Sequence, residues 1–142
     1  MEGNIPPHPN VTPDQEAPQT GPKKRILIVE DEKPLSHALK LKLSHEGYDV
    51  AVASDGEEGV RLAMAERFDL ILIDIIMPKM DGFAALSALK EKGSVPAVIV
   101  LSNLGQQEDI EKAKKLGAAD YMVKSNTPIS RIVEVVGTIL QS

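Results

Sequence analysis

Polar side chains able to do chemistry follow short apolar runs at four places in the chain. An acidic run over residues 30–32 follows one apolar run, and Asp74 follows another. Ser102 and Lys124 follow two more. Carboxylates crowded together repel one another unless a cation lies between them, and hard oxygen ligands with few protein contacts suit Mg²⁺. If the fold gathers these residues, their types predict magnesium-assisted phosphoryl chemistry.

Asp74 is the best candidate for a nucleophile in such chemistry. It follows the apolar run Leu70 to Ile73 and precedes a loop that Pro78 stiffens. An aspartate of this kind can form an aspartyl phosphate. Lys124 would then add a positive point charge, and the Ser102 hydroxyl would donate to another phosphoryl oxygen.

The elements that must position these residues alternate along the chain. Five apolar runs are each followed by a segment of helical spacing, and three of the runs are apolar on both faces. Strands of that kind are buried between two helix layers in a parallel sheet. The pattern predicts an α/β, doubly wound (βα)5 fold, in which ligands bind at the carboxyl ends of the strands. The expected strands are 25–29, 49–53, 70–73, 97–101 and 119–123, and the expected helices are 35–43, 56–67, 81–92, 106–116 and a last helix from 129.

The first 22 residues differ in composition from the rest of the chain. They hold six of the ten prolines, three acidic residues and no Lys or Arg. A segment with so few apolar side chains cannot bury enough surface to offset the entropy lost on ordering. We therefore predict a disordered, Pro-rich tail over residues 1–22 and a single folded domain over residues 23–142.

Composition excludes several classes of protein. The 142 residues contain no cysteine, which excludes disulfides and thiolate metal sites. The apolar runs are about five residues long, against the ~20 that a membrane span needs, and no secretory signal is visible. We expect a soluble, cytoplasmic protein that does not contact membranes. The net charge of −5 argues against direct nucleic-acid binding.

The candidate residues lie in four motifs whose order along the chain is that of a known family. Together these motifs resemble the receiver domain of two-component response regulators, and the resemblance covers about residues 24–141. It implies a flavodoxin-like sheet with strand order 2-1-3-4-5. The motifs are ILIVEDE (26–32), DIIMPKMDG (74–82), VIVLSN (98–103) and GAADYMVK (117–124).

The resemblance implies a phosphoacceptor and a metal site. Asp74 would accept a phosphoryl group from a sensor histidine kinase or a histidine phosphotransfer protein. Glu30 and Asp31 match the acidic pair that holds Mg²⁺, together with Asp74 and the backbone carbonyl of Ile76. Lys124 matches the lysine of the family pattern. Such a protein assists its own phosphorylation and dephosphorylation but is not an enzyme with a separate substrate.

The resemblance also implies a switch. Ser102 matches the hydroxyl that moves toward the phosphoryl group, and Tyr121 matches the aromatic residue that then changes rotamer. The surface formed by the helix over 106–116, the strand over 119–123 and the last helix would change in response. The expected output is contact with an unknown downstream protein or onward phosphotransfer, by a monomer or a phosphorylation-dependent dimer.

Three features depart from the family pattern. Ser125 stands where the family usually has proline after the lysine, and a cis bond before a non-proline residue costs roughly 2.5–4 kcal/mol, so we expect a trans bond here. Asn103 follows the switch hydroxyl where a small residue is common, which bears on the lifetime of the phosphorylated state. No output domain follows Gln141, so we expect a stand-alone receiver or a receiver cut from a larger protein.

Two acids within the motifs are interpreted as helix caps. Glu32 begins the first helix, where an acid is favourable against the helix dipole. Asp81, with Gly82 behind it, caps the helix over 81–92.

Other functions remain as alternatives. The chain could be a receiver-like binding module that works without phosphorylation. A phosphatase with an aspartyl nucleophile needs a second carboxylate two residues later, but Ile76 occupies that position. A dinucleotide-binding fold is least favoured, because no G-x-G-x-x-G follows the first strand.

Overall fold

The computed structural model describes residues 23–93 and 96–141, so the predicted tail over residues 1–22 lies outside the described residues. Five strands form one parallel sheet in the order β2-β1-β3-β4-β5, which confirms the predicted fold and strand order. The strands are β1 (Arg25–Val29), β2 (Asp49–Ala53), β3 (Leu70–Ile73), β4 (Ala97–Ser102) and β5 (Asp120–Val123). The helices are α2 (Lys33–His45), α3 (Gly56–Ala65), α4 (Gly82–Lys92), α5 (Gln107–Lys115) and α6 (Ile129–Gln141), with a 3-10 turn, η1, at Lys124–Asn126.

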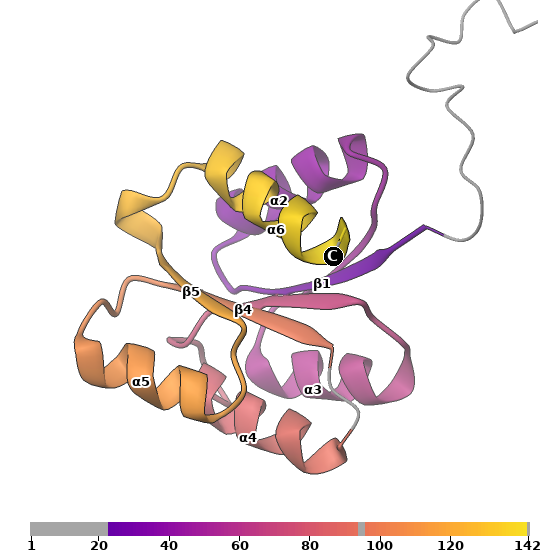
Figure 1. Ribbon diagram of the computed structural model, residues 1–142. Helices are drawn as coiled ribbons and strands as arrows, with labels where there is room; N and C mark the ends of the chain where they lie inside the picture. The colour runs from indigo at the N-terminus through magenta and orange to yellow at the C-terminus, as the bar shows by residue number, and fades with distance from the viewer. Residues whose placement is uncertain (1–22, 94–95, 142) are drawn as a thin grey trace, which may run out of the picture.

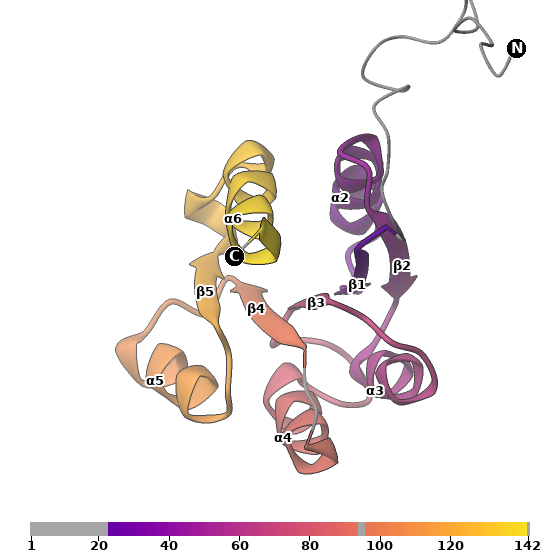
Figure 2. The same ribbon diagram turned by 45° about the vertical axis from the view of Figure 1, so that its right-hand side comes forward.

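Helices cover both faces of the sheet. Helices α2 and α6 lie together on one face, and α3, α4 and α5 lie on the other (Figures 1 and 2). Alternate residues of β1 point into separate cores, because successive side chains of a strand face opposite ways. Leu27 packs in the core beneath α3 to α5, whereas Ile28 packs in the core beneath α2 and α6. All four residues of β3 are buried, as the unbroken apolar run predicts.

Capping side chains begin two of the helices, and a glycine follows the end of a third. The Asp81 carboxylate accepts a hydrogen bond from the backbone N–H of Ala84 at 2.9 Å, which confirms the predicted cap of α4. Asp55 caps α3 in the same way by accepting from Glu58 at 2.8 Å. Gly47, just past the end of α2, has a φ of 99°, a conformation that glycine adopts without steric cost.

Two predicted helices differ from the structure by two residues at an end: α2 runs over Lys33–His45 where 35–43 was expected, and α3 ends early. The helix expected over 56–67 ends at Ala65. The Arg25 guanidinium donates to the Glu66 carboxylate at 2.8 Å and to the carbonyl of Arg67 at 3.1 Å. Glu66 has an extended backbone, and Phe68 is buried in the core. Contacts with a distant strand therefore stop the helix two residues before the expected end.

Parallel pairing brings the carboxyl ends of all five strands to one edge of the sheet. The ladder continues past the strands, because the N–H of Glu30 donates to the carbonyl of Ala53 and the N–H of Asp74 donates to the carbonyl of Val29, both at 3.0 Å. The backbone that carries the candidate acids is thus held by the sheet. Among the described helices, none combines the length and apolarity needed to cross a bilayer.

Candidate functional site

A cluster of three carboxylates lies at the carboxyl edge of the sheet. Glu30, Asp31 and Asp74 each offer an oxygen, and these oxygens all lie within 4.8 Å of one another. Glu30 and Asp74 are buried, whereas Asp31 is exposed. Backbone N–H groups hold the buried pair, because Glu32 donates to Glu30 Oε2 at 3.0 Å and Ile76 donates to Asp74 Oδ1 at 3.2 Å. Two carboxylates are therefore fixed and one faces solvent.

Lys124 reaches this cluster from the end of β5. Its ammonium lies 2.9 Å from Glu30 Oε1, 2.8 Å from Asp74 Oδ2 and 2.7 Å from Glu32 Oε1. The residue begins the 3-10 turn η1. No peptide bond among the described residues is cis, so the bond to Ser125 is trans, as the absence of proline predicts.

The electrostatics of the cluster are perturbed by burial. Desolvation raises the pKa of Glu30 to about 7; the hydrogen bond from Lys124 opposes this rise, and the charge of Asp74 adds to it. For Lys124, burial favours the neutral form, but the hydrogen bonds to Asp74, Glu32 and Glu30 outweigh burial and raise its pKa. Three carboxylates contact one ammonium here and Asp31 lies beside two of them, so acidic groups outnumber the cation.

This donor set fits a hard divalent cation. Mg²⁺ takes carboxylate, carbonyl and water oxygens, and keeps several waters when few protein ligands are available. Asp31, Asp74 and Ile76 line one small cavity of about 210 Å³. The cavity is lined by Asp31, Glu32, Asp74, Ile76, Asn103 and Lys124.

Glu32 corrects a prediction. It stands at the N-cap of α2, as expected, but its side chain makes no capping hydrogen bond. The carboxylate binds Lys124 instead. The side chain therefore turns away from the helix start and toward an ammonium that is only 10% exposed, where it makes a charge-assisted hydrogen bond.

Ser102 and Tyr121 both form a hydrogen bond with Leu104, in the loop between β4 and α5. Ser102 is fully buried at the end of β4, and its Oγ accepts from the N–H of Leu104 at 3.3 Å. The Tyr121 hydroxyl donates to the carbonyl of Leu104 at 2.5 Å. Ser102 is not among the residues that line the small cavity, whereas its neighbour Asn103 is. The two predicted switch residues are therefore linked through the loop between β4 and α5.

Gly82 supports the site in a way that sequence reasoning missed. Its N–H donates to the carbonyl of Ile75 at 2.8 Å. A Cβ at this position would lie 2.4 Å from the carbonyl oxygen of Asp74, a distance that side-chain carbons do not adopt. The pair Asp81-Gly82 marks a helix start in the sequence, but the close approach to Asp74 is visible only in three dimensions.

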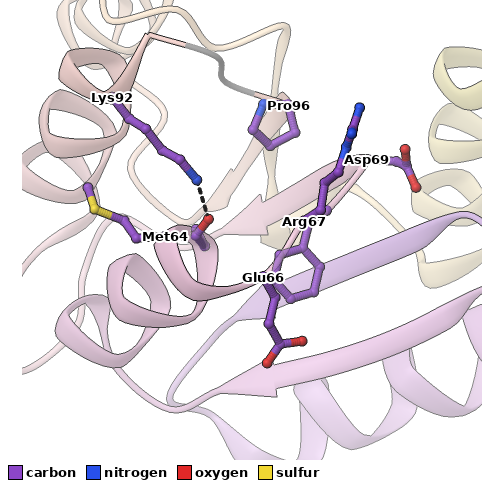
Figure 3. A pocket seen from close by; sticks show the side chains of 8 residues that line it. Met64, Glu66, Arg67, Asp69, Lys92 and Pro96 are labelled. Carbon is purple, nitrogen blue, oxygen red and sulfur yellow. Dashed lines mark hydrogen bonds between the residues drawn. The ribbon is translucent and has the colours of Figure 1, made fainter.

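A larger cavity, of about 560 Å³, lies among residues of α3, the segment leading into β3, and the end of α4 (Figure 3). Lys92 donates to the carbonyl of Ala63 at 2.6 Å there (Figure 3). Nearby, Arg25 pairs with Asp49 and Glu66. None of the predicted site residues lines this cavity, so this hollow and the chemical cluster are separate. Its lining residues are Ala63, Met64, Glu66, Arg67, Phe68, Asp69, Lys92 and Pro96.

Comparison with protein families and curated proteins gives one consistent result. The family model described as the response regulator receiver domain matches residues 26–136. A probable transcriptional regulator, ycf27, from Cyanophora paradoxa is 39% identical over 106 residues, which are 75% of this chain and 44% of that protein. The alkaline phosphatase synthesis transcriptional regulatory protein PhoP of Bacillus subtilis is 37% identical over 74% of this chain and 44% of its own length. The chain thus spans less than half the length of these relatives.

Solved structures agree with the family match. The receiver domain of the Francisella response regulator 1452 superposes with a TM-score of 0.79 at 30% identity, covering 84% of this chain and 98% of that one. The response regulator TrrA of Thermotoga maritima, solved in complex with Mg²⁺ and BeF, has a TM-score of 0.72 at 30% identity, covering 82% of this chain and 98% of that one.

Proposed function

The chain belongs to the response regulator receiver domain family of two-component signalling, and we propose that Asp74 is its phosphoacceptor. The observation that carries this proposal is the position of Asp74, which is buried with Glu30, lies beside Asp31 and is hydrogen-bonded to Lys124 at 2.8 Å. A sensor histidine kinase, a histidine phosphotransfer protein or a small phosphodonor would supply the group.

In the transfer, a carboxylate oxygen of Asp74 forms a bond to phosphorus. The bond between phosphorus and the donor breaks, and the leaving group keeps the electron pair. The N–H of Ile76 holds the other carboxylate oxygen, which orients the side chain. Asp31 and Asp74, with Glu30 and the backbone carbonyl of Ile76, would hold a Mg²⁺ ion, and that ion would supply positive charge for the phosphoryl oxygens. Lys124 supplies a second positive charge at the same place.

The response would pass from the phosphoryl group to a surface. Ser102 would donate its hydroxyl to a phosphoryl oxygen, which releases the hydrogen bond that it accepts from Leu104. Tyr121, bonded to the same residue, would then reorient. The affected surface is formed by α5, β5 and α6, and its readers would be a downstream protein or a second phosphotransfer partner.

Turnover of separate phosphate esters is disfavoured. The position two residues after Asp74 holds Ile76, whose side chain has no group to transfer a proton and is 57% exposed. Some relatives are named as transcriptional regulators, and the matched segment is 44% of their length. For the receiver domain itself we propose contact with another protein as the output.

The test uses acetyl phosphate with Mg²⁺, intact-mass measurement and mapping of the labelled peptide. The wild-type chain should gain one phosphoryl group at Asp74, and Asp74→Asn should gain none. Asp81→Asn is the matched control, because it makes the same change in the same loop and keeps a capping side chain. Full labelling of Asp74→Asn would refute the assignment.

A further inference from the structure

All three N–H groups of the Lys124 ammonium are engaged by carboxylates. It carries three N–H groups, and three carboxylates lie within 3 Å of it: Glu30, Glu32 and Asp74. A phosphoryl oxygen that is to bind Lys124 must displace one of these partners. Which partner leaves determines how easily the phosphorylated state forms.

We propose that Glu32 is the displaceable partner, an acid that holds Lys124 before phosphorylation and opposes the arrival of the phosphoryl group. The inference rests on the proposed role of Asp74. It adds that the residue after the acidic pair sets the strength of the response, through competition for one lysine.

Burial distinguishes the three partners. The side chains of Glu30 and Asp74 are 3% and 6% exposed, whereas that of Glu32 is 58% exposed. A buried carboxylate that loses its cation remains as an uncompensated charge, which is costly. A largely exposed carboxylate is solvated by water when its partner leaves, so the exposed ion pair is the cheapest of the three to break.

The local structure leaves the Glu32 side chain able to depart alone. Its backbone is anchored, because its N–H donates to Glu30 and its carbonyl accepts from Ser36. Its side chain makes no capping contact with α2. Release of Lys124 therefore needs rotation of one side chain and no change in the backbone.

The charge of Glu32 acts in opposite directions on the two ions that meet at this cavity. It lines the cavity together with Asp31 and Asp74. A negative carboxylate there repels an anionic phosphoryl group and competes with it for Lys124, but it attracts a divalent cation. Neutralising Glu32 should strengthen anion binding and weaken cation binding, a pair of changes that general damage to the fold would not produce.

The experiment compares wild type, Glu32→Gln and Glu91→Gln. Glu91 is an exposed acid near the end of α4, so its variant makes the same charge change away from the cavity. We would measure Mg²⁺ affinity alone, beryllofluoride affinity at saturating Mg²⁺, and the rate of labelling by acetyl phosphate. Glu32→Gln should bind beryllofluoride and take label about three- to tenfold better, bind Mg²⁺ about two- to fivefold less well, and lose its rate advantage as ionic strength rises.

A second variant tests whether the result comes from loss of the Glu32 charge or from the amide that Glu32→Gln introduces. Glu32→Ser removes the charge and gives α2 a capping hydroxyl, so it should behave as Glu32→Gln does. If both variants bind beryllofluoride no better than wild type, the inference is wrong. If wild type itself neither binds beryllofluoride nor takes label at Asp74, it is the proposed function that fails.

Discussion

Lys124 at the carboxyl edge of the sheet and Arg25 at the amino end of β1 are each surrounded by acidic side chains, but the two clusters differ in burial. The side chain of Lys124 is 10% exposed and that of Arg25 is 32% exposed. Arg25 lies 3.1 Å from Asp49 and 2.8 Å from Glu66, and both of these acids reach solvent. Two of the acids around Lys124 are buried.

The two cations also differ in what else holds them. The guanidinium of Arg25 lies 4.6 Å from the centre of the Phe68 ring and donates to the carbonyl of Arg67. Through Asp49, Arg25 ties the start of β1 to the start of β2. Through Arg67 and Phe68, it ties β1 to the segment before β3. Among the described residues, the ammonium of Lys124 forms its hydrogen bonds and ion pairs only with carboxylates. The same kind of ion pair thus fastens strands at one end of the sheet and holds an excess of negative charge at the other.

The largest effect should come from removing the positive charge of Lys124. Without Mg²⁺ at pH 8, Lys124→Met should lower the free energy of unfolding by about 3–5 kcal/mol, because buried acids are left unpaired. Urea denaturation measures this loss. Added Mg²⁺ should restore more stability to this variant than to wild type.

Arg25→Met is the matched comparison, since its partners are solvated. Its loss of unfolding free energy should be only about 1 kcal/mol. Equal losses in the two variants would show that burial does not separate the clusters.

A smaller effect should appear on changing pH. The pKa of Glu30 is about 7 in the folded protein and near 4.5 in the unfolded chain. Between these values the unfolded chain releases the proton while the folded protein keeps it, so the contribution of Glu30 to the unfolding free energy falls as pH rises and is constant above pH 7. In the presence of EDTA, we expect a fall of roughly 1–3 kcal/mol across this window.

Glu30→Gln isolates this contribution, because its side chain does not titrate. The difference in unfolding free energy between the variant and wild type should grow between pH 4.5 and 7, in favour of the variant. Parallel stability curves would show that the proton is not held by Glu30.

The smallest effect concerns salt. Because the Arg25 pairs are exposed, the difference in unfolding free energy between wild type and Arg25→Gln should shrink when the salt concentration rises to about 1 M, where the Debye length is ≈ 3 Å. Labelling of Asp74 by acetyl phosphate should be unchanged in this variant. An altered labelling rate would mean that the two edges of the sheet are coupled.

The backbone of this protein was predictable from periodicity. The run over residues 70–73 is apolar at every position, and only a strand between two helix layers buries all four side chains. Asp81 before Gly82 marked the start of α4 correctly. Once five parallel strands were predicted, the residues that follow them had to share an edge, so the meeting of Glu30, Asp31 and Asp74 followed from topology.

Side-chain pairings were less predictable. Glu32 and Lys124 are 92 positions apart, and the contact depends on distances that strand order does not define. The early end of α3 likewise depends on a contact between residues distant in sequence, because Arg25 binds Glu66, 41 positions away. Topology determines which residues lie near one another. Whether the Glu32 side chain caps a helix or pairs with a lysine depends on interaction energies of a few kcal/mol.

Gly82 makes the end of the sheet at Asp74 mechanically uneven. No side chain fits between Gly82 and the Asp74 carbonyl, so we expect the end of β3 and the start of α4 to move together. On the opposite flank the hydroxyl of Tyr121 donates to the Leu104 carbonyl, a link that a rotation about one bond can undo. Stiffness toward α4 and compliance toward α5 would give a displacement that starts at Asp74 a preferred direction, toward α5.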